Sequence, residues 1–352
     1  MDSVVLFEEI RSVDSGLVGI ATLNSERTLN ALTLQMVDLL YTKMLEWQAN
    51  TEISQVVIRG QGPRAFCAGG DVQKLYRSIL PSGQVDSVER NYCDSFFERE
   101  YRLDYLIHTY NKPVVCIGHG IVIGGGLGIL SACSVRCVTP TSKISIPEVT
   151  IGLFPDAGAS LLMKQLPVHQ ALFLGATGAQ INAADAIALG IATHLIDKPR
   201  EYIELLDRNA FTDLNQDLPE DGNLIALDSS LAEVLPDIPG SVEELVEAID
   251  SISMESPWAK AAVQKMHTGC PTTLGILLRQ LRMARNLDTA SIFRMEMTIA
   301  SQCVRQDDFP EGVRALLIDK DYSPRWRKLD QQVVDSHFSE PWDRHPLEDL
   351  GD

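Results

Sequence analysis

Metal-binding patterns and membrane spans are both missing from this chain of 352 residues. Its seven cysteines form no CxxC pair and its seven histidines no HxH or HExxH spacing, so a metal site has little support. The cysteines are odd in number and scattered through apolar runs, which indicates buried, reduced thiols and predicts a cytoplasmic protein. The most apolar stretch, residues 114–130, is interrupted by a histidine and six glycines, so we expect no transmembrane helix.

Positive charge is also scarce. Lys and Arg number 30 against 48 Asp and Glu, which gives a formal net charge of -18. Such a chain repels the phosphates of nucleic acids and of anionic lipids, so we expect neither nucleic-acid nor membrane partners. The acidic residues near the N-terminus are unlike a secretory signal or an Arg-rich transit peptide. An anionic small molecule remains compatible with this charge where helix N-termini or a local basic cluster offset the field.

Short apolar segments alternate with segments of helical periodicity over the first two hundred residues. Buried strands are predicted at 56–60 and 113–118, and each runs into a glycine-rich turn that precedes a helix. This alternation is typical of an α/β fold with largely parallel strands, repeated as ββα or βββα units. We therefore predict an α/β core over residues 1–200. Residues 201–352 are predicted as a C-terminal helical region with an extended tail that is pinned by its tryptophans.

Two carboxylates stand in the apolar, proline-bounded segment 144–158. Glu148 follows Pro147, and Asp156 follows Pro155. Removing water from a carboxylate raises its pKa, and a second carboxylate nearby raises one of the two pKa values further. One member of such a pair can then act as a base while the other acts as an acid. Taken alone, the pair is also compatible with a structural role.

Two glycine-rich segments, 67–71 and 124–128, each follow an apolar strand and precede a helix. The backbone N–H groups of Gly70 and Gly125 are therefore expected near helix N-termini, where negative charge is favoured. Two such donors that converge on one carbonyl oxygen form an oxyanion hole, in which losing one donor costs roughly 3 kcal/mol of transition-state stabilisation. Taken singly, each segment is more simply explained by the freedom of glycine to make tight turns.

The order and spacing of four motifs resemble the enoyl-CoA hydratase/isomerase (crotonase) superfamily. The resemblance implies a crotonase (ClpP-like) spiral of repeated ββα units with a C-terminal α-helical region. It also implies an acyl-CoA thioester as substrate, with the N–H groups of Gly70 and Gly125 stabilising an enolate or a tetrahedral oxyanion. No cofactor is implied, because CoA is part of the substrate. The motifs are residues 27–32 (RTLNAL), 65–71 (AFCAGGD), 119–126 (HGIVIGGG) and 147–148 (PE).

One position departs from the hydratases of this superfamily. Hydratases use two glutamates, one just after the glycine triplet and one in the Pro-Glu motif. Here the first position is Gly128, which argues against the addition of water across a double bond. Together with Glu148 and residues 151–156 (IGLFPD), Gly128 resembles the 3-hydroxyisobutyryl-CoA hydrolase branch, as do residues 311–321 (EGVRALLIDKD). The likeness covers most of the chain and is weakest over 200–250 and in the final segment.

The branch resemblance implies roles for three carboxylates. Glu148 would be the main catalytic carboxylate, which either attacks the thioester carbonyl or activates a water, and both routes stay open. Asp156 would position the water or the proton of the departing group. Glu100 would orient the hydroxyl of the acyl group, whereas its sequence pattern alone favours a solvated helix position.

The expected function is hydrolysis of a short hydroxyacyl-CoA ester, with 3-hydroxyisobutyryl-CoA of valine breakdown as the expected substrate. A related acyl group, such as 3-hydroxypropionyl, and assembly into a homo-oligomer stay open. One alternative is an enoyl-CoA hydratase or isomerase, and Gly128 argues against the hydratase. The other is a non-catalytic acyl-CoA-binding paralogue, against which the retained Glu148 and Asp156 argue.

Overall fold

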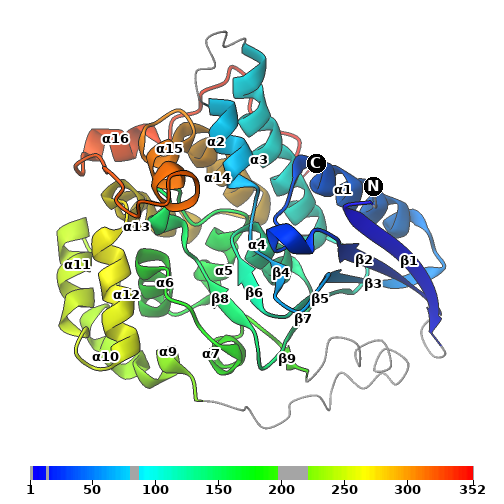
Figure 1. Ribbon diagram of the computed structural model, residues 1–352, viewed down its shortest axis with the longest axis horizontal. Helices are drawn as coiled ribbons and strands as arrows, with labels where there is room; N and C mark the ends of the chain where they lie inside the picture. The colour runs from blue at the N-terminus through cyan, green and yellow to red at the C-terminus, as the bar shows by residue number, and fades with distance from the viewer. Residues whose placement is uncertain (1–2, 13–15, 80–86, 197–220, 352) are drawn as a thin grey trace. The chain divides into compact units, whose positions relative to one another are not determined.

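The computed structural model describes residues 3–12, 16–79, 87–196 and 221–351 (Figure 1). The chain divides into two compact units, and each is assembled from three stretches of sequence. The predicted boundary at residue 200 lies outside the described residues and stays a prediction. The first unit comprises Met1–Gly70, Arg102–Ser145 and Gln180–Ala226, and the second comprises Asp71–Tyr101, Ile146–Ala179 and Leu227–Asp352.

Two β-sheets lie in the first unit. The larger sheet has six strands in the order β1-β2-β3-β5-β7-β9, in which β1 and β2 are antiparallel and all other neighbours are parallel. A smaller parallel sheet has the order β4-β6-β8. The bounds are β1 Val5–Ser12, β2 Gly16–Leu23, β3 Ile53–Gly60, β4 Ala65–Cys67, β5 Val114–Gly118, β6 Ile121–Ile123, β7 Val135–Val138, β8 Lys143–Ser145 and β9 His194–Leu195.

The strands repeat one plan. Each of β3, β5 and β7 belongs to the larger sheet and is followed along the chain by a short strand of the smaller sheet. The apolar runs of β3 and β5 are nearly continuous because parallel strands are buried on both faces. Val57, Val115 and Ile117 pack in one buried cluster with Val18 and Ile20 of β2. The predicted α/β fold of repeated units with largely parallel strands is confirmed.

Helices complete the first unit and dominate the second. In the first unit, α1 begins after Thr33, whose side chain accepts a hydrogen bond from Met36 N and so caps the helix. Helix α3 (Ser87–His108) contributes residues to both units. The other helices of the first unit are α4 Gly125–Ala132, α7 Ala183–Ala188 and α9 Asn223–Ala226, and α1 spans Leu34–Ala49.

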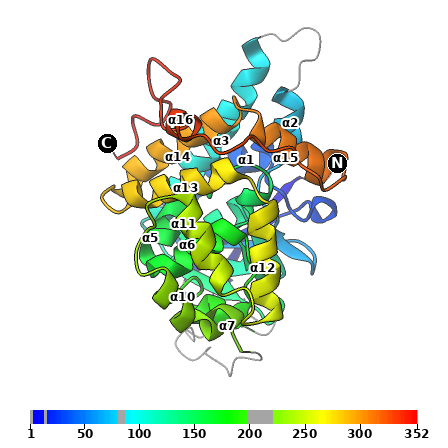
Figure 2. The same ribbon diagram turned by 90° about the vertical axis from the view of Figure 1, so that its left-hand side faces the viewer.

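The second unit is largely helical, as predicted for the C-terminal region. Figure 2 shows α10, α11 and α12 gathered beside α6, and these helices contact one another. None of the helices in the described ranges is both long and apolar enough to cross a membrane. The bounds are α2 Val72–Ile79, α5 Ala159–Gln165, α6 Val168–Thr177, α10 Asp228–Val234, α11 Val242–Ser251, α12 Pro257–Thr268, α13 Pro271–Ala284, α14 Thr289–Cys303, α15 Asp308–Val313, a π-helix Arg314–Ile318 and α16 Gln331–Ser336.

Candidate active site

The two glycine-rich segments contact each other within the first unit. Gly69 has a φ of +87°, and a Cβ atom there would lie 3.4 Å from the Ile123 carbonyl oxygen and 3.8 Å from the Gly125 nitrogen. A Cβ atom on Gly126 would lie 2.5 Å from the Cys67 carbonyl oxygen, which leaves no room for a side chain. The glycines therefore allow two backbone segments to approach more closely than residues with side chains would permit.

This approach brings the two predicted oxyanion residues into one region of the first unit. Gly125 is the first residue of α4, so its N–H group lies in the first turn and has no partner within the helix. The Gly70 segment is anchored by a parallel bridge to Leu32, whose N–H donates to the Gly69 carbonyl oxygen at 2.8 Å. The backbone can therefore present two N–H donors from neighbouring segments, as an oxyanion hole requires.

The three predicted carboxylates all lie in the second unit, and all are buried. The exposed fractions are 2% for Glu100, 4% for Glu148 and 8% for Asp156. The Tyr101 hydroxyl donates to Asp156 Oδ2 at 3.0 Å. Glu100 Oε1 and Glu148 Oε2 have no hydrogen-bond partner among the described residues. The solvated position that the helix pattern alone favours for Glu100 is therefore wrong, because this helix face is packed inside the protein.

Burial and mutual repulsion keep these carboxylates from ionising easily. Burial raises the pKa of Glu148 well above its usual range, and the charge of Asp156 raises it further. The same two causes raise the pKa of Glu100. Burial raises the pKa of Asp156 to about 7, against the lowering effect of the hydrogen bond from Tyr101. The three carboxylates therefore lie where burial and the charge of Asp156 both favour the protonated form of Glu100 and Glu148.

Helix α13 holds the backbone on which Asp156 lies. Thr273 Oγ1 donates to the Leu153 carbonyl oxygen at 2.6 Å, and Gln280 Nε2 donates to the Pro155 carbonyl oxygen at 2.6 Å. Both donors are buried, so each satisfies a carbonyl oxygen that water does not reach. The carboxylate segment is thus fixed by side chains that lie more than a hundred residues later in the sequence.

Helix α15 packs directly against the turn that follows Glu148. Gly152 has a φ of +67°, and a Cβ atom there would lie 2.5 Å from the Asp308 carbonyl oxygen. A Cβ atom on Gly312 would lie 2.4 Å from the Ile151 carbonyl carbon. The two segments that resemble the hydrolase branch in sequence, 151–156 and 311–321, therefore meet backbone to backbone at Gly312.

Comparison with known proteins identifies the family. A model of the enoyl-CoA hydratase/isomerase family matches residues 18–340. The chain belongs to this family. Among its relatives, the mitochondrial 3-hydroxyisobutyryl-CoA hydrolase of Gallus gallus is 35% identical, with 92% of this chain and 85% of the relative covered. The Danio rerio protein of the same name is 34% identical, with 96% of this chain and 90% of the relative covered. The predicted family membership is confirmed.

Solved structures of proteins that are named as other CoA enzymes have the same fold. A carnitinyl-CoA dehydratase from Mycobacterium thermoresistibile is 30% identical and aligns over 100% of both chains with a TM-score of 0.87. An enoyl-CoA hydratase from Rhodobacter sphaeroides is also 30% identical, with a TM-score of 0.84 over 96% of this chain and 98% of that one. The crotonase fold predicted from the sequence is thus confirmed.

Glu296 is a buried carboxylate beside the Asp156 turn that sequence reasoning missed. Glu296 lies on α14, is fully buried, and accepts hydrogen bonds from Gly158 N at 2.7 Å and Ser160 N at 2.9 Å. Burial raises its pKa to about 7. The available signal was a carboxylate within a run of mostly apolar residues, Phe293 to Ala300. A carboxylate buried there needs hydrogen-bond partners, and the local sequence pattern does not identify them.

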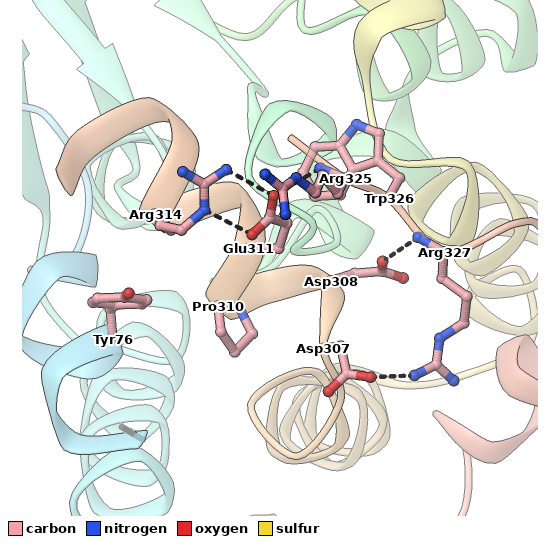
Figure 3. A pocket seen from close by; sticks show the side chains of 9 residues that line it. All are labelled: Tyr76, Asp307, Asp308, Pro310, Glu311, Arg314, Arg325, Trp326 and Arg327. Carbon is pink, nitrogen blue, oxygen red and sulfur yellow. Dashed lines mark hydrogen bonds and ion pairs between the residues drawn. The ribbon is translucent and has the colours of Figure 1, made fainter. Parts of the chain in front are cut away.

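A separate pocket of about 400 Å³ lies in the second unit (Figure 3). Its three arginines are matched by three carboxylates, and Arg314 alone forms ion pairs with Glu311, Asp319 and Asp321. The pocket therefore offers little net attraction to an anion. None of the predicted site residues lines it. The lining residues are Tyr76, Asp307, Asp308, Pro310, Glu311, Arg314, Arg325, Trp326 and Arg327.

All seven cysteines are buried and free of disulfides. Within the described ranges, no cluster of three or more His, Cys, Asp or Glu side chains is placed to hold a metal ion. Burial raises the pKa of Cys93 and Cys270 to about 11 and of Cys137 to about 12. These three thiols are therefore protonated and unreactive at neutral pH.

The raised carboxylate pKa values predict how stability depends on pH. Asp156 titrates near 7 in the folded protein, against an ordinary value of 3.8, so the folded state binds more protons between these values than the unfolded chain does. Its contribution to stability is therefore complete below about pH 4 and is lost as pH rises through 7. We expect Asp156→Asn to gain stability relative to wild type by about 3 kcal/mol between pH 4 and pH 8.

Urea unfolding of both proteins across that pH range measures this difference. The surface ion pairs contribute equally to the unfolding free energy of both proteins, so their contribution cancels in the difference. On their own they would make each protein less stable as pH falls. A difference in unfolding free energy that stays flat, or that narrows as pH rises, contradicts the raised pKa of Asp156.

Proposed function

We propose that this chain hydrolyses a short hydroxyacyl-CoA thioester, with 3-hydroxyisobutyryl-CoA of valine breakdown as its substrate. The observation that carries the proposal is similarity over nearly the whole chain to proteins named 3-hydroxyisobutyryl-CoA hydrolase. Gly128 adds to it, because the glutamate that a hydratase needs at this position is missing. The products are free CoA and the hydroxy acid.

Catalysis in this proposal depends first on stabilising negative charge at the thioester oxygen. The assignment gives that role to the N–H groups of Gly70 and Gly125, which belong to two adjoining backbone segments. Thiolate is a good leaving group, so the chief demand is to stabilise the oxyanion that forms on attack at the carbonyl carbon. Each donor is expected to supply about 3 kcal/mol of that stabilisation.

Glu148 carries the attack in this proposal. Ionised Glu148 either adds to the carbonyl carbon, giving a mixed anhydride that water then cleaves, or removes a proton from the water that adds. In both routes the carbon–sulfur bond breaks and the sulfur receives a proton. Asp156 is suited to handle that proton, because its pKa of about 7 lets it accept and donate protons at neutral pH. Single turnover in ¹⁸O-labelled water, with the label sought in Glu148, separates the two routes.

Glu100 is assigned to the hydroxyl of the acyl group. Its side chain is buried with one oxygen lacking a partner among the described residues, so a substrate hydroxyl would satisfy an otherwise unpaired acceptor. A site built to bind a hydroxyl strongly rejects the analogue that lacks one. The proposal needs no metal or separate cofactor, since CoA enters as part of the substrate.

Thiol release from a panel of CoA esters tests the function. We expect kcat/KM to be highest for 3-hydroxyisobutyryl-CoA. It should be about 10- to 100-fold lower for 3-hydroxypropionyl-CoA, which lacks one methyl group, and at least about 10³-fold lower for isobutyryl-CoA, which lacks the hydroxyl. Release of no thiol from either hydroxyacyl ester overturns the proposal, and equal rates for the hydroxylated and unhydroxylated esters overturn the role of Glu100.

Two further assignments belong to this proposal. We assign the chain to a reducing compartment such as the cytoplasm, which is supported by seven buried cysteines free of disulfides; the vertebrate relatives are themselves named mitochondrial. Assembly into a homo-oligomer is compatible with the proposal, and light scattering of the purified protein measures it.

One second candidate function has a specific observation in its favour. Two solved structures that are similar over nearly the whole chain are named as a dehydratase and a hydratase. Both reactions remove or add water at a double bond rather than cleave the thioester. Gly128 argues against this candidate, because it provides no carboxylate to share the proton transfers with Glu148.

A further inference from the structure

The turn that carries Asp156 has an unfavourable backbone conformation. Ala157 has a φ of +54° and Gly158 a φ of +82°, so two successive residues lie in the left-handed region. For alanine this conformation costs roughly 1 kcal/mol, and it persists only where the surrounding structure imposes it. Gly158 is also the N-cap residue of α5, and it has no side chain with which to cap the helix.

Glu296 supplies the missing cap from another helix. Its Oε2 accepts from Gly158 N at 2.7 Å and its Oε1 accepts from Ser160 N at 2.9 Å. Both N–H groups belong to the start of α5, where backbone donors have no partner within the helix. The carboxylate is fully buried on α14, so these bonds form away from water, where bonds to a charged acceptor are strongest.

Helix α13 supports the same turn without adding charge. Gln280 Nε2 donates to the Pro155 carbonyl oxygen at 2.6 Å and to Ser160 Oγ at 2.8 Å. The turn is therefore held on both sides of Asp156, by a neutral side chain from α13 and by a carboxylate from α14. Of these two, only Glu296 can change its charge.

We propose that Glu296 is the positioning residue of Asp156: it holds the turn 156–158 in its left-handed conformation, and its carboxylate and that of Asp156 repel each other. The proposal rests on the proposed function, because it assumes that Asp156 takes part in proton transfer. The charge of Asp156 raises the pKa of Glu296, and the charges of Asp156, Glu296 and Glu100 raise the pKa of the Tyr101 hydroxyl. Both carboxylates titrate near 7, so the pair shares protons at neutral pH.

Two substitutions separate the two actions of Glu296. Glu296→Gln keeps the size of the side chain but removes the charge and one of two acceptor oxygens. We expect kcat for thiol release to fall about 10- to 100-fold with KM changed less than about threefold, because orientation is lost and binding is not. The limb of the kcat–pH profile that reports Asp156 should move to lower pH by about one unit, because the opposing charge is gone.

Glu296→Asp keeps the charge but is one methylene too short to reach both N–H groups. We expect a similar fall in kcat with the pH profile unmoved. The matched control is Glu247→Gln, the same substitution at an exposed position of α11, which should leave kcat and the pH profile unchanged. If Glu296→Gln does not fold, the Glu296→Asp variant still decides the proposal, because a wild-type kcat in that variant overturns it.

A second substitution that restores kcat in the Glu296→Gln variant gives the most decisive test. Glycine adopts the left-handed conformation without strain, so Ala157→Gly added to Glu296→Gln should recover about tenfold of the lost kcat. An unchanged kcat in Glu296→Gln overturns the proposal. A fall in kcat with an unmoved pH profile and no rescue shows a role in stability alone and overturns it too. A wild-type protein that releases no thiol contradicts the proposed function instead, so the two failures are distinguishable.

Discussion

Glu148→Gln is expected to lower kcat for thiol release by at least about 10³-fold while the protein stays folded. The amide can neither attack the thioester carbonyl nor accept a proton from water, so both routes to hydrolysis are lost. Glu148 Oε2 makes no hydrogen bond to the described residues, so the substitution breaks no contact there. It also removes a buried carboxylate whose ionisation is costly, and the thermal unfolding midpoint should therefore be unchanged or higher at pH 8.

Kinetics and unfolding of the same preparations check this expectation. Glu247→Gln serves again as the matched control, because it makes the identical change on an exposed helix face. KM for the acyl-CoA should stay within about threefold in the Glu148 variant, since the carboxylate acts mainly in the transition state. A Glu148→Gln protein that releases thiol at the wild-type rate makes the catalytic assignment untenable.

Gly126→Ala is expected to lower kcat about 10²- to 10³-fold through the oxyanion donors. The added Cβ would lie 2.5 Å from the Cys67 carbonyl oxygen and 2.7 Å from the Cys67 Cβ atom, so β4 and the start of α4 must move apart. That displacement changes where the Gly125 N–H points relative to the Gly70 segment, and a misplaced oxyanion donor costs about as much as a missing one. Overpacking should also reduce stability by about 1 to 3 kcal/mol.

A second glycine separates the catalytic effect from the loss of stability. Gly240 has no left-handed φ, and the nearest atoms to a Cβ there belong to the flexible carboxylate of Glu244, so Gly240→Ala should change neither activity nor stability appreciably. The measurement is kcat at a temperature well below the unfolding midpoint of every variant. A folded Gly126→Ala protein with wild-type kcat contradicts the assignment of Gly70 and Gly125 to the oxyanion.

Periodicity and local chemistry were sufficient to predict the α/β repeats and the buried pair of carboxylates. The near-continuous apolar runs of β3 and β5 follow directly from burial on both faces of a parallel sheet. Glu148 and Asp156 were recognisable because they interrupt an apolar segment. Trp326 Nε1 donates to the Thr268 carbonyl oxygen at 2.9 Å, so this tryptophan does anchor the tail as expected.

Long-range contacts were not predictable in this way. Glu296 reaches Gly158 across 138 positions of sequence, and no local pattern connects the two. The burial of Glu100 followed only from the family resemblance, since its helix pattern favours solvent. The division into two units is hidden for a similar reason, because 71–101 and 146–179 are short insertions between stretches of the first unit.

Two assays run on one wild-type preparation test the central claim most directly, because hydrolysis and hydration leave different products. The first follows free thiol released from 3-hydroxyisobutyryl-CoA, and the second follows the ultraviolet absorbance of an α,β-unsaturated acyl-CoA, which hydration removes. With Gly128 in place of the second glutamate, we expect rapid thiol release and no appreciable loss of enoyl absorbance. Rapid loss of that absorbance without thiol release from the hydroxyacyl ester would contradict the account.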